Sequence, residues 1–165
     1  MQHLNTRRGF TLLEILVVLL IIGILAAVAL PQYQRAKWKT AFNITAATTR
    51  KIYEAQRLYY LEKGVYANSL DELPIEIPGT QLVAGQSISC SANYYGPSCF
   101  LSKGNNALVW IVYSFSDNNK GRLSCAVYPI ANQKIFKSFC SELTGDPTGT
   151  DVGYAWAYRG PIPSY

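Results

Sequence analysis

The feature that most constrains this chain is an apolar run close to its N-terminus. Phe10–Leu30 spans 21 residues and contains a single charged side chain, that of Glu14. About 20 apolar residues in a helix cross the roughly 30 Å hydrocarbon core of a bilayer. A short leader with Arg7 and Arg8 precedes the run, and basic residues favour the cytoplasmic side. The sequence therefore predicts one membrane-spanning helix with a cytoplasmic leader.

Three kinds of N-terminal segment share these features. A secretory signal peptide would be cut after Ala29, where Ala27-Val28-Ala29 has the small-residue pattern of a cleavage site. The apolar core of such a peptide is usually only about 7–15 residues long, and burying Glu14 there is costly. An ordinary membrane anchor explains the length but gives Glu14 no role. The third kind is a leader that a dedicated peptidase removes between Gly9 and Phe10.

The third interpretation matches a known family. The segment RRGFTLLEILVVLLIIGILAAVALP resembles the N-terminus of type IV prepilins and of the pseudopilins that share it. The matching positions are Gly9, the aromatic Phe10, Thr11, Glu14 and the closing Pro31. The resemblance implies that a prepilin peptidase cuts after Gly9 and methylates the new N-terminus on Phe10. The short leader is similar to that of the type IVa subgroup.

Glu14 lies one helical turn from the amine that this cut would create on Phe10. A carboxylate is also favoured near a helix N-terminus. Because an unpaired charge in hydrocarbon is costly, we expect Glu14 to meet a cation at the same depth, such as the Phe10 amine of a neighbouring subunit. The alternative is that Glu14 reaches the membrane interface alone. If Glu14 pairs with the Phe10 amine of a neighbouring subunit, Phe10 and Glu14 are the assembly residues.

The end of the apolar run is its softest part. Gly23 weakens a helix by about 1 kcal/mol relative to alanine. Pro31 lacks an N–H group and clashes with the carbonyl of Ala27. The resemblance implies that this segment melts during assembly and makes the fibre extensible, so Gly23 and Pro31 are the expected flexibility residues. The alternative is a simple kink where the helix leaves the membrane.

The helix is expected to continue beyond Pro31 to Lys63, with Gly64 as its stop. A helix from Thr11 to Lys63 is about 80 Å long. One face of its second half carries residues at spacings of three and four: Ala41, Ile44, Thr48, Ile52, Ala55 and Tyr59. Its first half has no partner within one chain, so it belongs in a membrane or in a helical bundle.

The rest of the chain reads as turns and short strands. An S-x-x-E capping box at Ser69–Glu72 predicts one short helix before Pro74. Four segments have strand-like patterns, of which the last three are expected to form an antiparallel meander: Gln81–Ser89, Ala107–Phe115, Arg122–Ile130 and Gln133–Phe136. The resemblance implies an α+β fold of ladle shape, with a long N-terminal helix packed on a C-terminal antiparallel sheet. The expected divisions are 1–9 for the leader, 10–30 and 31–63 for the two helix halves, and 64–165 for the head.

Four cysteines lie in the head, at Cys90, Cys99, Cys125 and Cys140. No C-x-x-C pair is present, which disfavours a zinc ribbon. An even number of cysteines in an exported domain predicts two disulfides, with three ways to pair them. We expect Cys90–Cys99 and Cys125–Cys140, because both close short loops. The second also resembles the C-terminal disulfide loop of type IVa pilins.

The composition disfavours an enzyme. The one histidine, His3, lies in the leader, so the processed chain lacks Ser/His/Asp, Cys/His and His-metal chemistry. We expect no metal or cofactor, and a solvated turn rather than a calcium loop at Asp146 and Asp151. Removing the leader leaves 13 basic against 10 acidic side chains, a formal charge of +3 that attracts phosphates weakly. An edge strand is therefore preferred over a single-stranded DNA site for the aromatic tail, whose residues are Tyr154, Trp156, Tyr158 and Arg159.

The resemblance implies a type IV pilus subunit that polymerises into an extracellular filament for motility, adhesion or DNA uptake. Its expected partners are other pilin subunits, the prepilin peptidase, an inner-membrane assembly platform and the membrane itself, with DNA as a weaker candidate. Before assembly it would lie in the bacterial inner membrane with a periplasmic head, an orientation that the cluster Arg35, Lys37 and Lys39 opposes and the cysteines favour. The alternatives are a pseudopilin of a type II secretion system and a single-span anchored enzyme or receptor.

Overall fold

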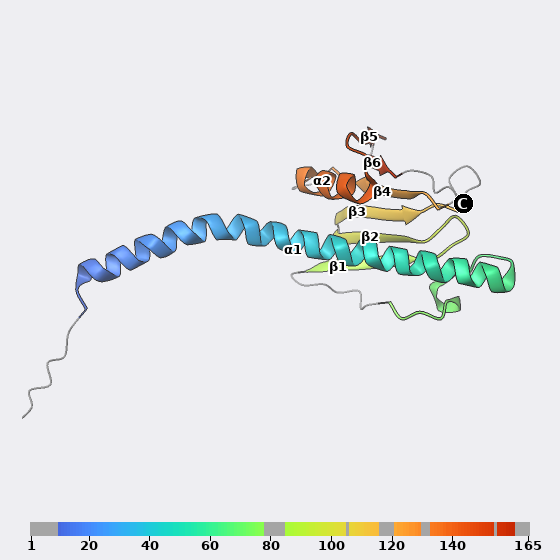
Figure 1. Ribbon diagram of the computed structural model, residues 1–165, viewed down its shortest axis with the longest axis horizontal. Helices are drawn as coiled ribbons and strands as arrows, with labels where there is room; N and C mark the ends of the chain where they lie inside the picture. The colour runs from blue at the N-terminus through green and yellow to red at the C-terminus, as the bar shows by residue number, and fades with distance from the viewer. Residues whose placement is uncertain are drawn as a thin grey trace, which may run out of the picture. The chain divides into compact units, whose positions relative to one another are not determined.

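The computed structural model describes residues 10–77, 85–104, 106–115, 121–129, 133–153 and 155–160. Its elements follow the order α1, η1, β1, β2, β3, β4, α2, β5 and β6 (Figure 1). The chain divides into two units, with the boundary between Lys37 and Trp38 inside α1. Each unit is described by itself.

In the first unit, α1 begins at Leu12 and carries its apolar residues without covering them. Every residue from Phe10 to Ala36 is exposed. Among the described residues, α1 is the helix long and apolar enough to cross a membrane. Pro31 lies inside the helix, which continues on both sides of it although the ring removes one backbone donor.

In the second unit, α1 reaches Lys63 and ends where Gly64 adopts a φ of 75° and donates its N–H to the carbonyl of Tyr60 at 2.8 Å. This is the predicted stop, because glycine enters the left-handed region without a Cβ penalty. The predicted face is the packed one: four of its six residues are buried and the other two, Ile44 and Tyr59, are half-buried. The buried stripe is wider than predicted and also contains Phe42, Thr45, Thr49, Tyr53 and Gln56.

After α1, a 3₁₀ helix, η1 (Leu70–Glu72), forms at the predicted capping box. The Ser69 hydroxyl accepts from the N–H of Asp71 at 3.2 Å. The carboxylate of Glu72 accepts from the N–H of Asn68 at 3.3 Å. The short helix is confirmed, and its single 3₁₀ turn reflects the length allowed before Pro74.

The strands form one six-stranded antiparallel sheet in the order β1-β2-β3-β4-β6-β5. Their bounds are Gln86–Ser91 for β1, Ser98–Lys103 for β2, Asn106–Tyr113 for β3, Leu123–Val127 for β4, Thr150–Asp151 for β5 and Trp156–Arg159 for β6. The α+β architecture predicted from the sequence is confirmed. Residues 81–84, 116–120 and 130–132, which belong to predicted strands and turns, lie outside the described residues.

One predicted strand is wrong and two strands were missed. Gln133–Phe136 is the first turn of a helix, α2 (Gln133–Thr144), so the last three predicted segments are not a meander. The apolar residues Phe136, Phe139, Cys140 and Leu143 recur with helical spacing, but only beyond the end of the predicted strand. One missed strand is β2, whose polar and apolar residues alternate too little to distinguish it from a loop. The other is the two-residue β5, in a segment expected to be a solvated turn.

The two helices of the second unit pack on the same face of the sheet (Figure 1). Phe42 of α1 lies against Phe139 of α2, with ring centroids 5.5 Å apart. Trp38 meets Phe136 edge to face at 5.3 Å. Their other core partners on the sheet include Val109, Ile111 and Cys125. The opposite face of the sheet therefore carries the alternate side chains of β3 and β4.

Candidate assembly site and the head that accompanies it

The start of α1 is closed by a reciprocal pair of hydrogen bonds between Thr11 and Glu14. The Glu14 carboxylate accepts from the Thr11 N–H at 2.8 Å and from the Thr11 hydroxyl at 2.9 Å. The Glu14 N–H donates to the Thr11 hydroxyl oxygen at 3.3 Å. This is a capping box, which satisfies two backbone donors that would otherwise lack partners at the helix end.

The capping box gives Glu14 a role within its own chain that our sequence analysis missed. The signal was present, because T-L-L-E has the same spacing as the S-x-x-E at Ser69–Glu72. Glu14 is at once a helix cap and an exposed anion one turn from Phe10. Phe10 itself is 81% exposed, and Gly9 lies outside the described residues.

The apolar side chains that follow Glu14 are exposed along the whole first unit. The membrane-length window of α1 has none of its residues buried within the chain. Gly23 has no heavy atom within 4 Å of the position that a Cβ would occupy. This surface is therefore satisfied only by lipid or by other helices.

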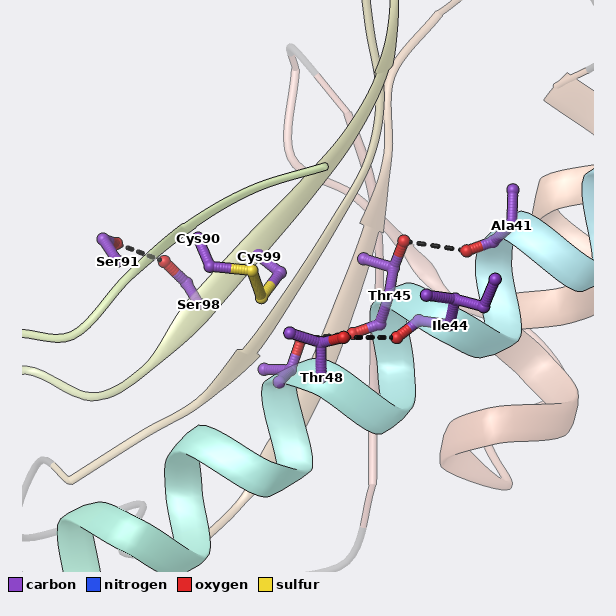
Figure 2. Close-up of a disulfide and its surroundings, with 9 residues drawn as sticks. Ala41, Ile44, Thr45, Thr48, Cys90, Ser91, Ser98 and Cys99 are labelled. Atoms are coloured by element: carbon purple, nitrogen blue, oxygen red, sulfur yellow. Dashed lines mark hydrogen bonds between the residues drawn. A yellow bond between two sulfur atoms is a disulfide. The ribbon is translucent and has the colours of Figure 1, made fainter. Parts of the chain in front are cut away.

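In the head, one disulfide joins two neighbouring strands. Cys90 of β1 lies directly opposite Cys99 of β2, with a Cα–Cα distance of 4.1 Å. Figure 2 shows this disulfide beside the turn of α1 that carries Thr45 and Thr48, whose hydroxyls donate to carbonyls four residues earlier. The predicted short-range pairing is the one in the structure, and it links β1 covalently to β2.

The second disulfide joins the sheet to a helix. Cys125 of β4 is bonded to Cys140 of α2, with a Cα–Cα distance of 5.5 Å. Both residues are fully buried. This is again the predicted pairing, although the sequence analysis expected a strand where the structure places the start of α2.

The two carboxylates considered for calcium act as turn caps. The Asp146 carboxylate accepts from the backbone N–H groups of Thr148, Gly149 and Arg159 at 3.1–3.2 Å. These bonds, led by that of Gly149, hold the pKa of Asp146 below its usual range. Asp151 accepts from the N–H of Gly153 at 2.8 Å. The part of the chain that the structure describes brings together no group of three or more metal-ligating side chains.

The aromatic tail does not form a single stacking surface. Trp156 lies under the ammonium of Lys137 on α2, at 3.6 Å from its ring centroid. Tyr158 is buried beside Gly149, and burial raises its pKa. Arg159 is on the other face of β6, and Tyr154 lies outside the described residues. The strand is also not an edge strand as predicted, because β5 pairs with its outer side.

The first half of α1 is apolar and exposed, and it starts with the capped carboxylate of Glu14. The same chain has an α+β head with two disulfides. These features define a class of membrane-anchored subunit whose helix needs partners outside its own chain. A sequence model of the prokaryotic N-terminal methylation motif matches residues 4–30. Fimbrial protein EcpC of Eikenella corrodens is 30% identical over 143 residues, which cover 83% of this chain and 84% of that protein. The chain therefore belongs to the type IV prepilin family.

Two further relatives are shorter matches or more distant. The type IV wide pilus major component PilA4 of Thermus thermophilus is 28% identical over 109 residues, covering 65% of this chain and 81% of that protein. The type IV major pilin protein PilE of Neisseria gonorrhoeae is 41% identical over 68 residues, covering 38% of each chain. No solved structure matches the chain.

Proposed function

We propose that this chain is a subunit of a type IV pilus, made as a precursor that prepilin peptidase cuts between Gly9 and Phe10 and methylates on Phe10. The processed subunit waits in the bacterial inner membrane as a single-span protein with a periplasmic head. An assembly platform in that membrane then adds it to an extracellular filament of the same subunits. The filament serves motility, adhesion or DNA uptake.

The observation that carries this proposal is the uncovered apolar half of α1 with Glu14 at its start. Lipid satisfies the apolar side chains but leaves a carboxylate in hydrocarbon at a high cost. A bundle of the same helices satisfies both, because the Phe10 amine of one subunit can pair with Glu14 of another. That several relatives are named pilus components supports the same conclusion.

The capping box adds a step to this assembly. In the precursor, Thr11 already occupies Glu14 with two hydrogen bonds. The Thr11 donors are neutral, so they leave the negative charge of the carboxylate uncompensated. The amine of a neighbouring subunit adds the opposite charge and forms an ion pair with it. Thr11 therefore holds the carboxylate at the helix end until the partner arrives.

Helix flexibility is the remaining part of the proposal. Gly23 and Pro31 lie in the half of α1 whose residues are all exposed in the part of the chain that the structure describes. Pro31 removes a helical donor, and Gly23 lowers the helix propensity. We propose that α1 opens between these residues when subunits pack together or when the filament is stretched.

The test compares the protein in membranes with the material sheared from the cell surface, using intact mass and N-terminal sequencing. A start at N-methylated Phe10, with most of the protein in the sheared fraction, is the expected result. A processed protein found only in membranes would indicate a type II secretion pseudopilin instead. An intact Met1 beside active peptidase, or a start at Leu30, would refute the assignment in favour of an anchored or secreted protein.

Replacing Gly9 gives a matched test of the cleavage site. Gly9→Val should leave the leader attached, because a bulkier residue stands where the peptidase is proposed to cut. Gly23→Ala is the control, since it changes another glycine of the same segment outside the cleavage site. Normal processing of the Gly9 variant would contradict the assigned cut.

A further inference from the structure

The face of the sheet that the two helices leave free contains a groove of about 540 Å³. Val109, Ile111 and Cys125 point to the core, so the alternate residues of β3 and β4 point to this groove. Its volume is within the range of roughly 300–1,000 Å³ that is usual for small-ligand sites.

One row of side chains across the sheet explains why the groove exists. The register aligns Phe100, Trp110, Ala126 and Ala157 on four successive strands. Phe100 stacks on Trp110 with centroids 5.6 Å apart and an interplanar angle of 11°. The next two residues are alanines, so the space beyond Trp110 stays open. The groove therefore has an aromatic wall and a floor of small residues.

A rigid loop forms one end of the groove. The side-chain oxygen of Asn93 accepts from the N–H groups of Tyr95 and Gly96 at 3.0 and 3.2 Å. The carbonyl of Tyr95 accepts from the N–H of Phe115 at 3.0 Å. A Cβ on Gly96, whose φ is 131°, would lie 1.9 Å from the carbonyl oxygen of Tyr113. The Cys90–Cys99 disulfide closes the base of the loop, so its shape is set before any ligand arrives.

The polar groups of the groove carry positive charge. Arg122 and Arg159 line it, and no aspartate or glutamate is among its described lining residues. The Arg122 side chain donates to the carbonyl of Gly160 at 2.9 Å, which fixes its position. Ser124 lies opposite Arg159 in the register of β4 and β6. These features predict a ligand with one anionic group.

One buried polar group at the groove lacks a hydrogen-bond partner in the described part of the chain. The indole N–H of Trp110 is buried and makes no hydrogen bond there. The Ser124 hydroxyl belongs to a half-buried residue that lines the groove. Buried polar groups without partners are uncommon and call for an explanation. The groove presents the ring of Trp110 and the Ser124 hydroxyl to a ligand, because the buried indole nitrogen has no surface that a ligand atom could reach.

We propose that this groove binds an acidic saccharide, with a sugar ring against Trp110 and its carboxylate on Arg159. Hydroxyl groups that donate and accept, as on Ser98, Ser114 and Ser124, suit a polyol. Single-stranded nucleic acid requires a longer track of cations than two arginines and a processed chain of charge +3 provide. The proposal concerns the head alone, so its failure would leave the assembly proposal untouched.

The experiment uses the processed full chain in lipid nanodiscs, labelled with ¹⁵N in its three tryptophans. Glucuronic acid is titrated while the three indole N–H signals are followed by NMR. We expect the Trp110 signal to shift with a dissociation constant of about 1 mM or below. Trp38 packs against Phe136 and Trp156 under Lys137, so their signals are internal controls and should stay in place.

Variants test the charge. Arg159→Gln should weaken glucuronic acid binding about tenfold or more, since a charge-assisted hydrogen bond is lost. Arg50→Gln removes the same charge from the exposed side of α1 and should leave the affinity unchanged. Trp110→Phe keeps a smaller stacked ring, so it should bind glucuronic acid more weakly. Calorimetric titration measures this, because the reporting indole is lost.

Three results would overturn the proposal. Equal affinity for glucose, which lacks the carboxylate, would show that the groove does not select an acidic sugar. A shift of Trp110 by a thymidine oligonucleotide at lower concentration than by glucuronic acid would make the groove a nucleic-acid site. No shift of Trp110 with either sugar would show that the groove binds neither.

Discussion

The two halves of α1 have the same backbone structure and opposite surroundings. From Phe10 to Ala36 every residue is exposed, although nearly all are apolar. From Trp38 to Lys63 the helix buries a stripe that includes Phe42 at 1% and Ile52 at 0% exposure. Among the residues that the structure describes, the second half thus packs against the rest of the chain and the first half does not.

This difference in burial indicates which molecules cover each half of α1. The second half mixes charged residues with its buried stripe, and Glu54 lies within 4.0 Å of both Arg50 and Arg57 on the exposed side. The first half has no polar side, so water is not a suitable solvent for any of its faces. Its structure is completed only by molecules outside the chain.

The largest effect is expected at the boundary between membrane and filament. Glu14→Ala should reduce sheared filament by about tenfold or more, because the Phe10 amine of the neighbour would be buried without a partner. The head should stay folded, since Glu14 is outside its unit. Quantifying the protein in sheared and membrane fractions checks both statements.

Thr11→Val separates the two roles of Glu14. It removes the cap hydroxyl, which is worth about 1 kcal/mol, but keeps the carboxylate. If Glu14 acts between subunits, this variant should assemble far better than Glu14→Ala. Equal defects in the two variants would show that Glu14 matters only as a helix cap. Normal piliation of Glu14→Ala would show that assembly does not need the proposed charge pair.

A matched pair of core and surface changes sharpens the contrast between the halves. Phe42→Ala should lower the free energy of unfolding of the head by about 3–5 kcal/mol, because a fully buried ring leaves a cavity. Leu20→Ala, at a side chain that is 60% exposed, should leave that free energy unchanged. Chemical denaturation in detergent micelles, followed by near-UV circular dichroism, measures both. A comparable loss for Leu20→Ala would place the first half in the core of the head.

The two disulfides should differ in how much each adds to the free energy of unfolding of the head. Replacing Cys125 and Cys140 by serine should cost about 3 kcal/mol, since the bond closes the longer of the two loops and ties α2 to the sheet. Replacing Cys90 and Cys99 should cost less, because their strands remain paired by the ladder between β1 and β2. The midpoints of urea denaturation give the order, and the reverse order would contradict this account.

The smallest effect is a pH dependence at Asp146. Its pKa is lowered from 3.8 by backbone hydrogen bonds, so the charged form stabilises the head above the unfolded pKa. That stabilisation is lost as the pH falls through the lower, folded value. Asp146→Asn should therefore reduce the melting temperature most near neutral pH, and the difference should close below about pH 4.

Glu76→Gln is the control for this measurement, because it makes an equal charge change outside the loop. Its carboxylate makes no hydrogen bond among the residues that the structure describes. A gap between Asp146→Asn and the parent protein that persisted at acid pH would show that the aspartate acts through shape and not through charge.

The sequence predicts best where one interaction dominates. The apolar run, the stop at Gly64 and both short-range disulfides follow from solvation, a glycine conformation and loop length. The packed face of α1 is predicted in position but not in width. Thr45 and Thr49 bury their hydroxyls by bonding to carbonyls of the same helix, a compensation that hydrophobic periodicity does not register.

Gln56 is the clearest of these misses. It is fully buried, donates to the carbonyl of Ala67 at 2.8 Å and accepts from its N–H at 2.9 Å. The Gln56 amide thus makes the two backbone hydrogen bonds that a neighbouring strand would otherwise make with Ala67. The groove beside Trp110 was equally invisible, because it depends on the register that sets two alanines next to an aromatic pair.

The loop that ends at Gly96 also has a practical meaning. Its backbone is fixed by Asn93, by the disulfide and by a glycine that no other residue replaces, whereas the Tyr94 side chain is 68% exposed. The frame and the displayed side chain are therefore separable. A small clickable amino acid at position 94 would give a fluorescent tag at one defined point of every subunit, and so a way to label the protein without disturbing its frame.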